Sequence, residues 1–151
     1  VDAVVMAGMG GILMTEILEQ DLAKAQSFKK LIFQPRKDVG KLRFWLYDHG
    51  FSIIGENLVR ERKYICEVLT AIPKEVAITR QMNGDDIEYE FPHTLLDYRD
   101  ELLTEYLSIK KRLEVEILEN MRKGKYTTPR EIRHQEYRIS YLEYLLRSNA
   151  K

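Results

Sequence analysis

The residues best suited to chemistry lie near the start of the chain. A short apolar, β-branched run ends there in Ala7, Gly8, Met9, Gly10 and Gly11. Closely spaced glycines let the backbone adopt positive φ and let a ligand approach the main chain. In open α/β sheets, ligands bind beyond the carboxyl ends of the strands. We therefore take these five residues as a candidate catalytic segment, with an ordinary tight strand-to-helix turn as the alternative.

A second candidate set follows the next apolar run, residues 30–34. Gln34 and Pro35 end this predicted strand, and Arg36 and Lys37 come directly after it. The Gln34 amide could contact a base edge or a ribose, or the pair could only terminate the strand. Two more cations follow in the next predicted helix, Lys41 and Arg43. This basic cluster is suited to RNA phosphates, and a solvated helix face is the alternative.

The third set is basic and lies in the last third of the chain. Residues 110–138 contain nine Lys or Arg and five Glu, although the whole chain is neutral. Tyr126 and Tyr137 are interleaved with these cations, a composition suited to phosphate contact and base stacking. Charged coiled-coil flanks are the alternative. The candidate RNA contacts are Lys110, Lys111, Arg112, Arg122, Lys123, Lys125, Arg130 and Arg133.

Histidine and cysteine offer little chemistry. No two of His49, His93 and His134 have metal-ligand spacing, so we predict no metal site. The single cysteine, Cys66, alternates with apolar neighbours and is expected in the core. It has no intramolecular disulfide partner, which favours a reducing, cytoplasmic environment. No stretch approaches the roughly 18 apolar residues of a membrane span, and no signal peptide is visible, so no membrane partner is expected.

Hydrophobic periodicity predicts the elements that position the first two sets. Residues 2–7 and 30–34 are expected to be parallel strands, because a helix over residues 12–22 connects them. The apolar face of that helix is expected to comprise Ile12, Leu13, Ile17 and Leu18. Asp38 is a plausible N-cap for the next helix, and Gly50 its stop.

The hydrophobic pattern then changes from alternating strands and helices to two consecutive strands. Residues 51–59 and 64–72 are β-rich runs separated by four residues, and so short a link joins only antiparallel strands. The predicted order is therefore βαβα followed by a β-hairpin. Residues 73–92 form a connector with a turn at Asn83, Gly84, Asp85 and Asp86.

The remaining residues are expected to form two long helices. The first starts at a capping box of Thr94 and Asp97 and runs to Gly124. Its expected apolar seam comprises Leu95, Tyr98, Leu102, Tyr106, Ile109, Leu113, Ile117 and Met121. The second starts at Thr128, with the seam Ile132, Ile139, Leu142 and Leu146. The short link predicts an antiparallel helical hairpin, a coiled coil.

These features resemble the bacterial tRNA (adenine-N1)-methyltransferases that modify the adenine at position 22, which are class I S-adenosylmethionine-dependent enzymes. The resemblance rests on residues 2–11, on Phe33, Gln34 and Pro35, on Trp45 and Leu46, on strand 64–69 and on the helical extension. It implies an α/β fold, the C-terminal part of a Rossmann-like methyltransferase sheet. Residues 1–92 would be the second half of the catalytic domain, and residues 93–151 a tRNA-binding helical hairpin.

The resemblance also implies roles. The segment from Ala7 to Gly11 would hold an adenine near the methyl group of S-adenosyl-L-methionine through main-chain groups and Met9. Gln34, Pro35, Arg36 and Lys37 would contact the substrate, and the hairpin cations would bind tRNA or, as an alternative, the hairpin would form a homodimer. The chain opens in mid-strand without the family's cofactor-binding half. We therefore expect the 151 residues alone to be inactive and to bind the cofactor weakly. A non-catalytic RNA- or protein-binding module is the alternative function.

Overall fold

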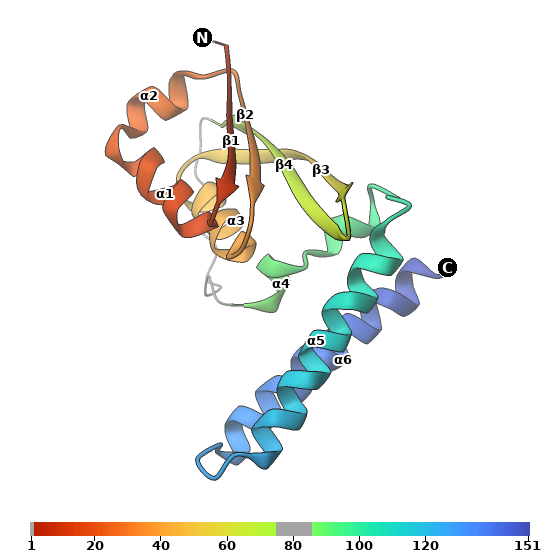
Figure 1. The fold of residues 1–151 in the computed structure, drawn as a ribbon. Helices are drawn as coiled ribbons and strands as arrows, with labels where there is room; N and C mark the ends of the chain where they lie inside the picture. Colours follow the sequence, from red (N-terminus) through yellow and green to blue (C-terminus); the bar gives the residue numbers. More distant parts are fainter. Residues whose placement is uncertain (1, 75–85) are drawn as a thin grey trace. The chain divides into compact units, whose positions relative to one another are not determined.

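The computed structural model describes residues 2–74 and 86–151, and the chain divides into two compact units between Tyr98 and Arg99 (Figure 1). The first unit carries a sheet and its helices, and the second is a pair of helices. The predicted turn at Asn83, Gly84 and Asp85 lies outside the described residues.

The first unit is built on one four-stranded sheet. Its strands are β1 (Ala3–Met9), β2 (Lys30–Pro35), β3 (Phe51–Glu61) and β4 (Tyr64–Pro73), in the spatial order β1-β2-β4-β3. β1 and β2 are parallel, whereas β4 runs antiparallel to both of its neighbours. The predicted α/β class and the order βαβα followed by a β-hairpin are confirmed. The later strand of the hairpin enters the sheet next to β2.

Three helices connect and cover the strands: α1 (Gly11–Gln20), α2 (Leu22–Ser27) and α3 (Val39–Asp48). Asp38 does precede α3, but its side chain makes no capping hydrogen bond and its backbone is left-handed, with φ of 57°. The predicted boundary is confirmed and the predicted capping interaction is wrong. Gly50 follows α3 with φ of 81°, a conformation that glycine adopts without a steric penalty.

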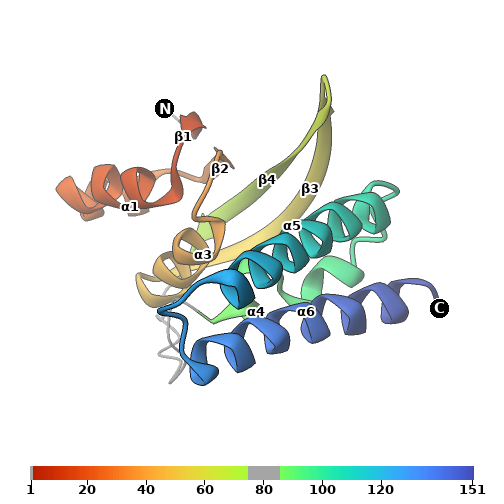
Figure 2. The ribbon, with the colours of Figure 1, turned by 60° about the horizontal axis from the view of Figure 1, so that its bottom comes forward.

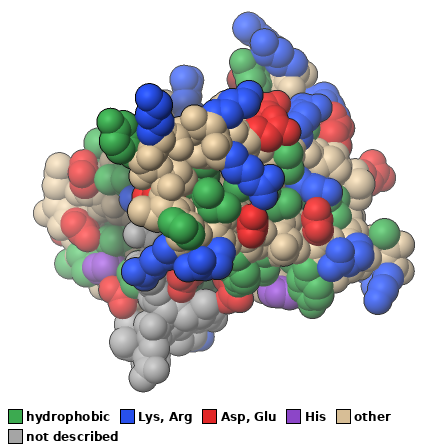
Figure 3. Space-filling model, turned by 90° about the horizontal axis from the view of Figure 1, so that it is seen from below, with side chains coloured by type: hydrophobic (Ala, Val, Ile, Leu, Met, Phe, Trp, Pro, Cys, Tyr) green, Lys and Arg blue, Asp and Glu red, His purple; other side chains and the backbone are tan. Residues whose placement is uncertain are grey.

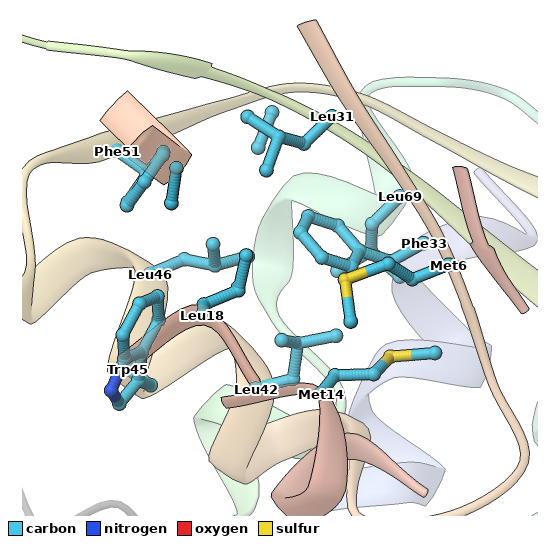
Figure 4. Packing of buried hydrophobic residues seen from close by; sticks show 12 residues of the cluster. Met6, Met14, Leu18, Leu31, Phe33, Leu42, Trp45, Leu46, Phe51 and Leu69 are labelled. Carbon is cyan, nitrogen blue, oxygen red and sulfur yellow. The ribbon is translucent and has the colours of Figure 1, made fainter. Parts of the chain in front are cut away.

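The core lies between the sheet and helices α1 and α3 (Figures 2 and 4). Leu31 and Phe33 are fully buried and alternate with the half-buried Ile32 and Gln34 along β2, as strand periodicity requires. Leu42 and Leu46, one turn apart on α3, pack into the same cluster. These residues fix the helices against one face of the sheet.

The predicted apolar face of α1 is partly wrong. Gly11, Met14 and Leu18 are its buried residues, whereas Ile12, Leu13 and Ile17 are between 39% and 47% exposed. Positions 11, 14 and 18 follow the spacing of one helical stripe, and this stripe packs against the core. The extra apolar residues flank the stripe and therefore point away from the sheet.

A buried ionic network holds α3 to the hairpin of β3 and β4. The guanidinium of Arg43 is 1% exposed; its Nε donates to Glu56 at 2.7 Å and its Nη2 to Glu67 at 3.0 Å. Nη1 donates to the carbonyl oxygens of Tyr89 and Glu90, each at 2.7 Å. Burial acts to lower the pKa of Arg43, but the charges of Glu67 and Glu56 outweigh it and raise that pKa. Arg43 is a structural residue, so its predicted contact with RNA phosphates is wrong.

The predicted long helix from Thr94 is wrong in its first part. The chain instead forms α4 (Ile87–Glu90), a short 3₁₀ turn (His93–Leu96), and then α5 (Leu103–Lys123). Arg99 has a positive φ of 47°, which interrupts any helix there. The Asp100 carboxylate accepts a hydrogen bond from the Leu102 backbone N–H at 2.9 Å. The acidic side chain at the start of α5 is therefore Asp100 and not the predicted Asp97.

Helix α6 (Pro129–Asn149) begins with the predicted capping box. The Glu131 carboxylate accepts from the Thr128 backbone N–H at 2.7 Å and from its hydroxyl at 3.1 Å, and these bonds lower the pKa of Glu131. Asn149 donates to Thr104 at 2.9 Å, which joins the end of α6 to the start of α5. The helices are therefore antiparallel, as predicted.

The seam between these helices differs from the predicted one. In α5, Leu103, Tyr106, Leu107, Glu114 and Leu118 are buried, whereas the predicted Leu113 and Ile117 are about half exposed. In α6 the buried residues are Gln135, Tyr141, Leu142 and Leu145; the predicted Ile132, Ile139 and Leu146 are half-buried. The spacing of apolar residues mispredicted the buried seam, because polar side chains that pair with each other occupy the middle of it. The coiled-coil geometry itself stays a prediction.

That pairing centres on Glu114. Gln135 donates to its carboxylate at 2.6 Å, and Arg138 donates at 2.7 Å and 3.1 Å. Burial acts to raise the pKa of Glu114, but the hydrogen bonds from Arg138 and Gln135 and the charge of Arg138 outweigh it. The pKa of Glu114 is therefore lowered, and the charged form stabilises the helix pair.

Replacing Glu67 by Ala should destabilise the first unit by about 3–5 kcal/mol, because it leaves the buried Arg43 charge with one carboxylate fewer. Urea unfolding at neutral pH measures this change. The control is Glu136→Ala, which removes an exposed ion pair with Arg122 and should cost less than about 1 kcal/mol. Equal losses in the two variants would contradict the structural role of the Arg43 network.

The stability of the helical hairpin should fall on acidification through Glu114. Its pKa is lower in the folded state than in the unfolded state, so its contribution is present above the unfolded pKa, about 4.3, and is lost as pH falls through the folded pKa. Thermal unfolding followed by helical circular dichroism between pH 7 and pH 3 tests this. In Glu114→Gln the part of the acid-induced loss that belongs to this carboxyl should disappear; an unchanged pH profile would contradict the assignment.

Candidate functional site

The register of β1 and β2 brings the two predicted sets of site residues together. Ala7 pairs with Gln34, and Met9 with Pro35, with an irregularity between Ala7 and Met9 that leaves Gly8 as an extra residue. Beyond the strands, the Arg36 backbone N–H donates to the Met9 carbonyl at 3.0 Å. The segments that follow β1 and β2 therefore lie side by side at one end of the sheet.

The structure explains the three glycines of this segment in different ways. Gly8 has φ of 75°, and a Cβ there would lie 3.7 Å from the Arg36 guanidinium. Gly11 is buried, and its Cβ would overlap the Asp38 carbonyl oxygen. Gly10 has an ordinary φ of −74°, and its Cβ would meet only the Lys37 side chain, at 3.2 Å. Positive φ is thus needed at Gly8, whereas close packing is needed at Gly11.

The candidate segment is therefore mostly strand and not loop. Ala7, Gly8 and Met9 belong to β1, and Gly11 is already the first residue of α1. Ala7 and Gly8 are exposed, Met9 and Gly10 are half-buried, and Gly11 is buried. The exposed residues of the segment are thus Ala7, opposite Gln34, and Gly8.

Gln34 lies in a small polar cluster that joins three strands. Its Nε2 faces the Glu61 carboxylate at 3.5 Å, and the Cys66 thiol donates to the same oxygen at 3.6 Å. Cys66 is half-buried and not a core residue, because the buried face of β4 carries Glu67, Leu69 and Ala71 instead. Sequence reasoning missed Glu61, because its proximity to Gln34 arises only when β4 inserts beside β2.

The thiol is unsuited to nucleophilic chemistry. Partial burial and the hydrogen bond to Glu61 raise the pKa of Cys66, outweighing the opposing effects of Gln34 and Arg36. The nucleophilic form of cysteine is the thiolate, so a raised pKa keeps the group inert at neutral pH.

The remaining basic residues of this edge are exposed. Arg36 and Lys37 lie at the surface after β2, where Pro35 is buried, and Lys41 is exposed on α3. Exposed cations can meet phosphates without a desolvation penalty, whereas Arg43 cannot. Arg36 and Lys37 therefore stay candidates for anion contact.

The predicted RNA contacts of the hairpin are distributed over both of its helices. Lys111 pairs with Glu143 at 3.3 Å, Arg122 pairs with Glu136 at 2.9 Å, and the Lys110 ammonium lies 5.4 Å from the Tyr106 ring centre. Lys123, Lys125, Arg130 and Arg133 are exposed, as is Arg112. In the space-filling view, Lys and Arg side chains are interspersed with hydrophobic and acidic ones (Figure 3).

The surroundings of the histidines do not indicate a metal centre. His49 stacks on Trp45 with ring centres 4.2 Å apart, and its Nδ1 lies 2.8 Å from the Trp45 carbonyl oxygen. No group of three His, Cys, Asp or Glu among residues 2–74 and 86–151 could hold a metal ion. Within the same ranges, no helix combines the length and apolar character that a membrane span requires.

The edge formed by Ala7, Gly8 and Gln34 offers hydrogen-bond donors and acceptors in a fixed register, with cations beside them. Such an arrangement can orient a planar polar group, such as a base edge, and hold a neighbouring phosphate. Comparison with known proteins identifies the lineage. A model of the TrmK family, described as tRNA (adenine(22)-N(1))-methyltransferase, matches residues 1–141. The chain belongs to this family.

Individual relatives agree with that assignment. A tRNA (adenine(22)-N(1))-methyltransferase of Bacillus subtilis is 39% identical over 70 residues, which are 46% of this chain and 29% of the relative. A Streptococcus pneumoniae protein, a candidate tRNA (m1A22) methyltransferase solved in complex with S-adenosyl-L-methionine, is 25% identical with a TM-score of 0.77. An uncharacterised Listeria monocytogenes protein is 27% identical with a TM-score of 0.80.

The overlap is one-sided. The two solved structures align with 97% of this chain, but the chain covers only 60% and 63% of theirs. The alignment supports the expectation that the fold is part of a Rossmann-like methyltransferase.

The glycines should respond differently to alanine. Gly11→Ala should cost about 1–3 kcal/mol or more by overlap with the Asp38 backbone, and Gly8→Ala about 1–2 kcal/mol because of its positive φ. Gly10→Ala should cost about 1 kcal/mol or less, because Gly10 is the N-cap of α1, where alanine is only somewhat less favourable than glycine, and because the Lys37 side chain near its Cβ is flexible. Chemical unfolding of the three variants measures the order; a Gly10 variant as unstable as the Gly11 variant would contradict it.

Proposed function

We propose that the polypeptide carrying this chain transfers a methyl group from S-adenosyl-L-methionine to N1 of an adenine in tRNA, the adenine at position 22. The observation that carries the proposal is the pairing of Ala7 with Gln34, which brings the exposed Ala7 and the Gln34 amide together at one strand end. The family assignment supports the same reaction.

The residues present fit the substrate side of a cofactor site. Ala7 and Gly8 are exposed at the carboxyl end of β1, and β1 pairs on one side only among the described strands. In Rossmann-like sheets, ligands bind at this end of the strands. When bound, S-adenosyl-L-methionine supplies an electrophilic methyl group. We expect the 151 residues alone to bind it weakly, since the resemblance puts most cofactor contacts in a half that this chain does not contain.

The reaction asks little of this chain beyond positioning. Adenine N1 is unprotonated at neutral pH and its lone pair is already nucleophilic, so no strong base is needed. The main-chain groups of Ala7 to Gly10 and the Gln34 amide would orient the base, and Met9 would contact its face. Arg36 and Lys37 would hold the adjoining phosphate. Good alignment alone can lower a barrier by roughly 7–11 kcal/mol.

The helical hairpin would supply tRNA affinity away from the reacting base. Its proposed phosphate contacts are Lys110, Lys111, Arg112, Arg122, Lys123, Lys125, Arg130 and Arg133. Exposed cations are suited to this role because each neutralised phosphate releases condensed counterions. A tRNA substrate is also the reason to infer a cytoplasmic location. Homodimerisation through the hairpin remains the competing prediction for this unit.

Methyl transfer to tRNA transcripts tests the function. The polypeptide should label a transcript with adenine at position 22, as 1-methyladenosine by mass spectrometry, and not a transcript with guanine there. Gln34→Ala should slow single-turnover transfer about tenfold to a hundredfold, because one base-directed hydrogen bond is lost. Gln20→Ala, which changes an exposed amide at the end of α1, should be neutral. RNA binding without methylation would identify a non-catalytic binding module instead.

A further inference from the structure

The positive charge of the second unit is concentrated at one end. Residues 121–134, which contain the turn between α5 and α6, hold five Lys or Arg and one Glu. The rest of the unit, residues 99–120 and 135–151, holds seven Lys or Arg against eight Asp or Glu. We call residues 121–134 the hairpin tip. An anionic partner is therefore attracted more strongly to the tip than to the rest of the hairpin.

The tip also presents an aromatic ring without packing. Tyr126 is 94% exposed, whereas Tyr106 and Tyr141 in the helices of the same unit are 4% and 8% exposed. Tyr126 follows Lys125 in the turn after Gly124. An exposed ring among cations has the composition of sites that stack nucleic-acid bases.

The tip also has an open hollow of about 520 Å³, and one of its lining residues, Thr127, directly follows Tyr126 in the sequence. Met121, Thr127, Arg130, Glu131, His134 and Gln135 line it. Its volume is in the range that accommodates a small ligand such as one nucleotide. Glu131 and Gln135 are engaged in the capping box and with Glu114. Arg130, Thr127 and His134 are the polar groups that remain for a ligand.

We propose that the hairpin tip binds one unpaired nucleotide of the RNA substrate, with the base stacked on Tyr126 and the sugar-phosphate directed towards the hollow that Thr127 and Arg130 line. This inference rests on the proposed function and deepens it, because it specifies that the RNA is single-stranded where it contacts the hairpin tip. Bases inside a duplex already stack on one another, so a paired segment cannot occupy the site. The tip therefore selects RNA with a loop or bulge at this contact.

The test compares two RNA probes that differ only in unpaired structure. One is a stem-loop carrying 2-aminopurine in its loop, and the other is a blunt duplex of equal length. Tyr126→Leu should weaken stem-loop binding about tenfold or more and remove the stacking-induced change in 2-aminopurine fluorescence. Duplex binding and the salt dependence should be unchanged, since no cation is lost. Tyr126→Phe should bind like the parent.

Tyr64→Leu is the matched control, because Tyr64 is also exposed, at 61%, beside a lysine, but lies in the first unit. It should leave stem-loop binding unchanged. Parental binding and fluorescence in Tyr126→Leu would overturn the proposal, as would an equal loss for both probes.

Cation variants separate this outcome from failure of the proposed function. The triple variant R122A/K123A/K125A should lower the salt slope of binding for both probes, and by more than K110A/K111A/R112A does. If neither triple variant changes affinity at any salt concentration, the hairpin does not bind RNA and both ideas fail. If only the Tyr126 result is negative, the phosphate contacts stand and the stacking site does not.

Discussion

The parallel pairing of β1 and β2 is the constraint on which the rest of the first unit depends. It brings Ala7 opposite Gln34 and aligns the two segments that leave the strands. Their close approach is possible because Gly11 has no side chain against the Asp38 carbonyl. The backbone N–H of Gly11 then donates to the Lys37 carbonyl at 2.8 Å. A larger residue at position 11 would separate the two segments, and with them Ala7 and the Gln34 amide.

The buried charge of Arg43 imposes a second constraint. A guanidinium removed from water must have its donors satisfied, and here they are shared among Glu56, Glu67 and two backbone carbonyls. These partners come from β3, β4 and the segment around α4, so one side chain links three parts of the unit. The link is directional, unlike the apolar core, and it specifies where residues 89–90 lie. Its net contribution to stability is smaller than its hydrogen bonds suggest, because two carboxylates are desolvated as well.

The second unit follows the same principle with weaker burial. Glu114 lies within the seam of α5, and its partners Gln135 and Arg138 are four and seven residues beyond Glu131 on α6. A polar pair at one level of a helical seam fixes the register of the two helices, whereas apolar residues tolerate slippage. The register in turn brings the end of α5 and the start of α6 together at the tip, where the cations and Tyr126 are displayed.

The sequence by itself determined the strands, their order βαβα followed by a β-hairpin, the position of the turn at Gly50 and the capping box at Thr128. Each depends on neighbours within a few residues, through periodicity, backbone preference or a local hydrogen bond. It also carried the family resemblance, whereas the pairing of Ala7 with Gln34 was decided by the tertiary structure. The tertiary structure alone decided that Arg43 is buried, that Cys66 is not in the core, that Leu113 is off the seam and that Glu61 faces Gln34. Those outcomes depend on which strand pairs with β2 and on which charged side chains pair across the fold. Both are long-range contacts, and the spacing of residues along the chain does not predict them.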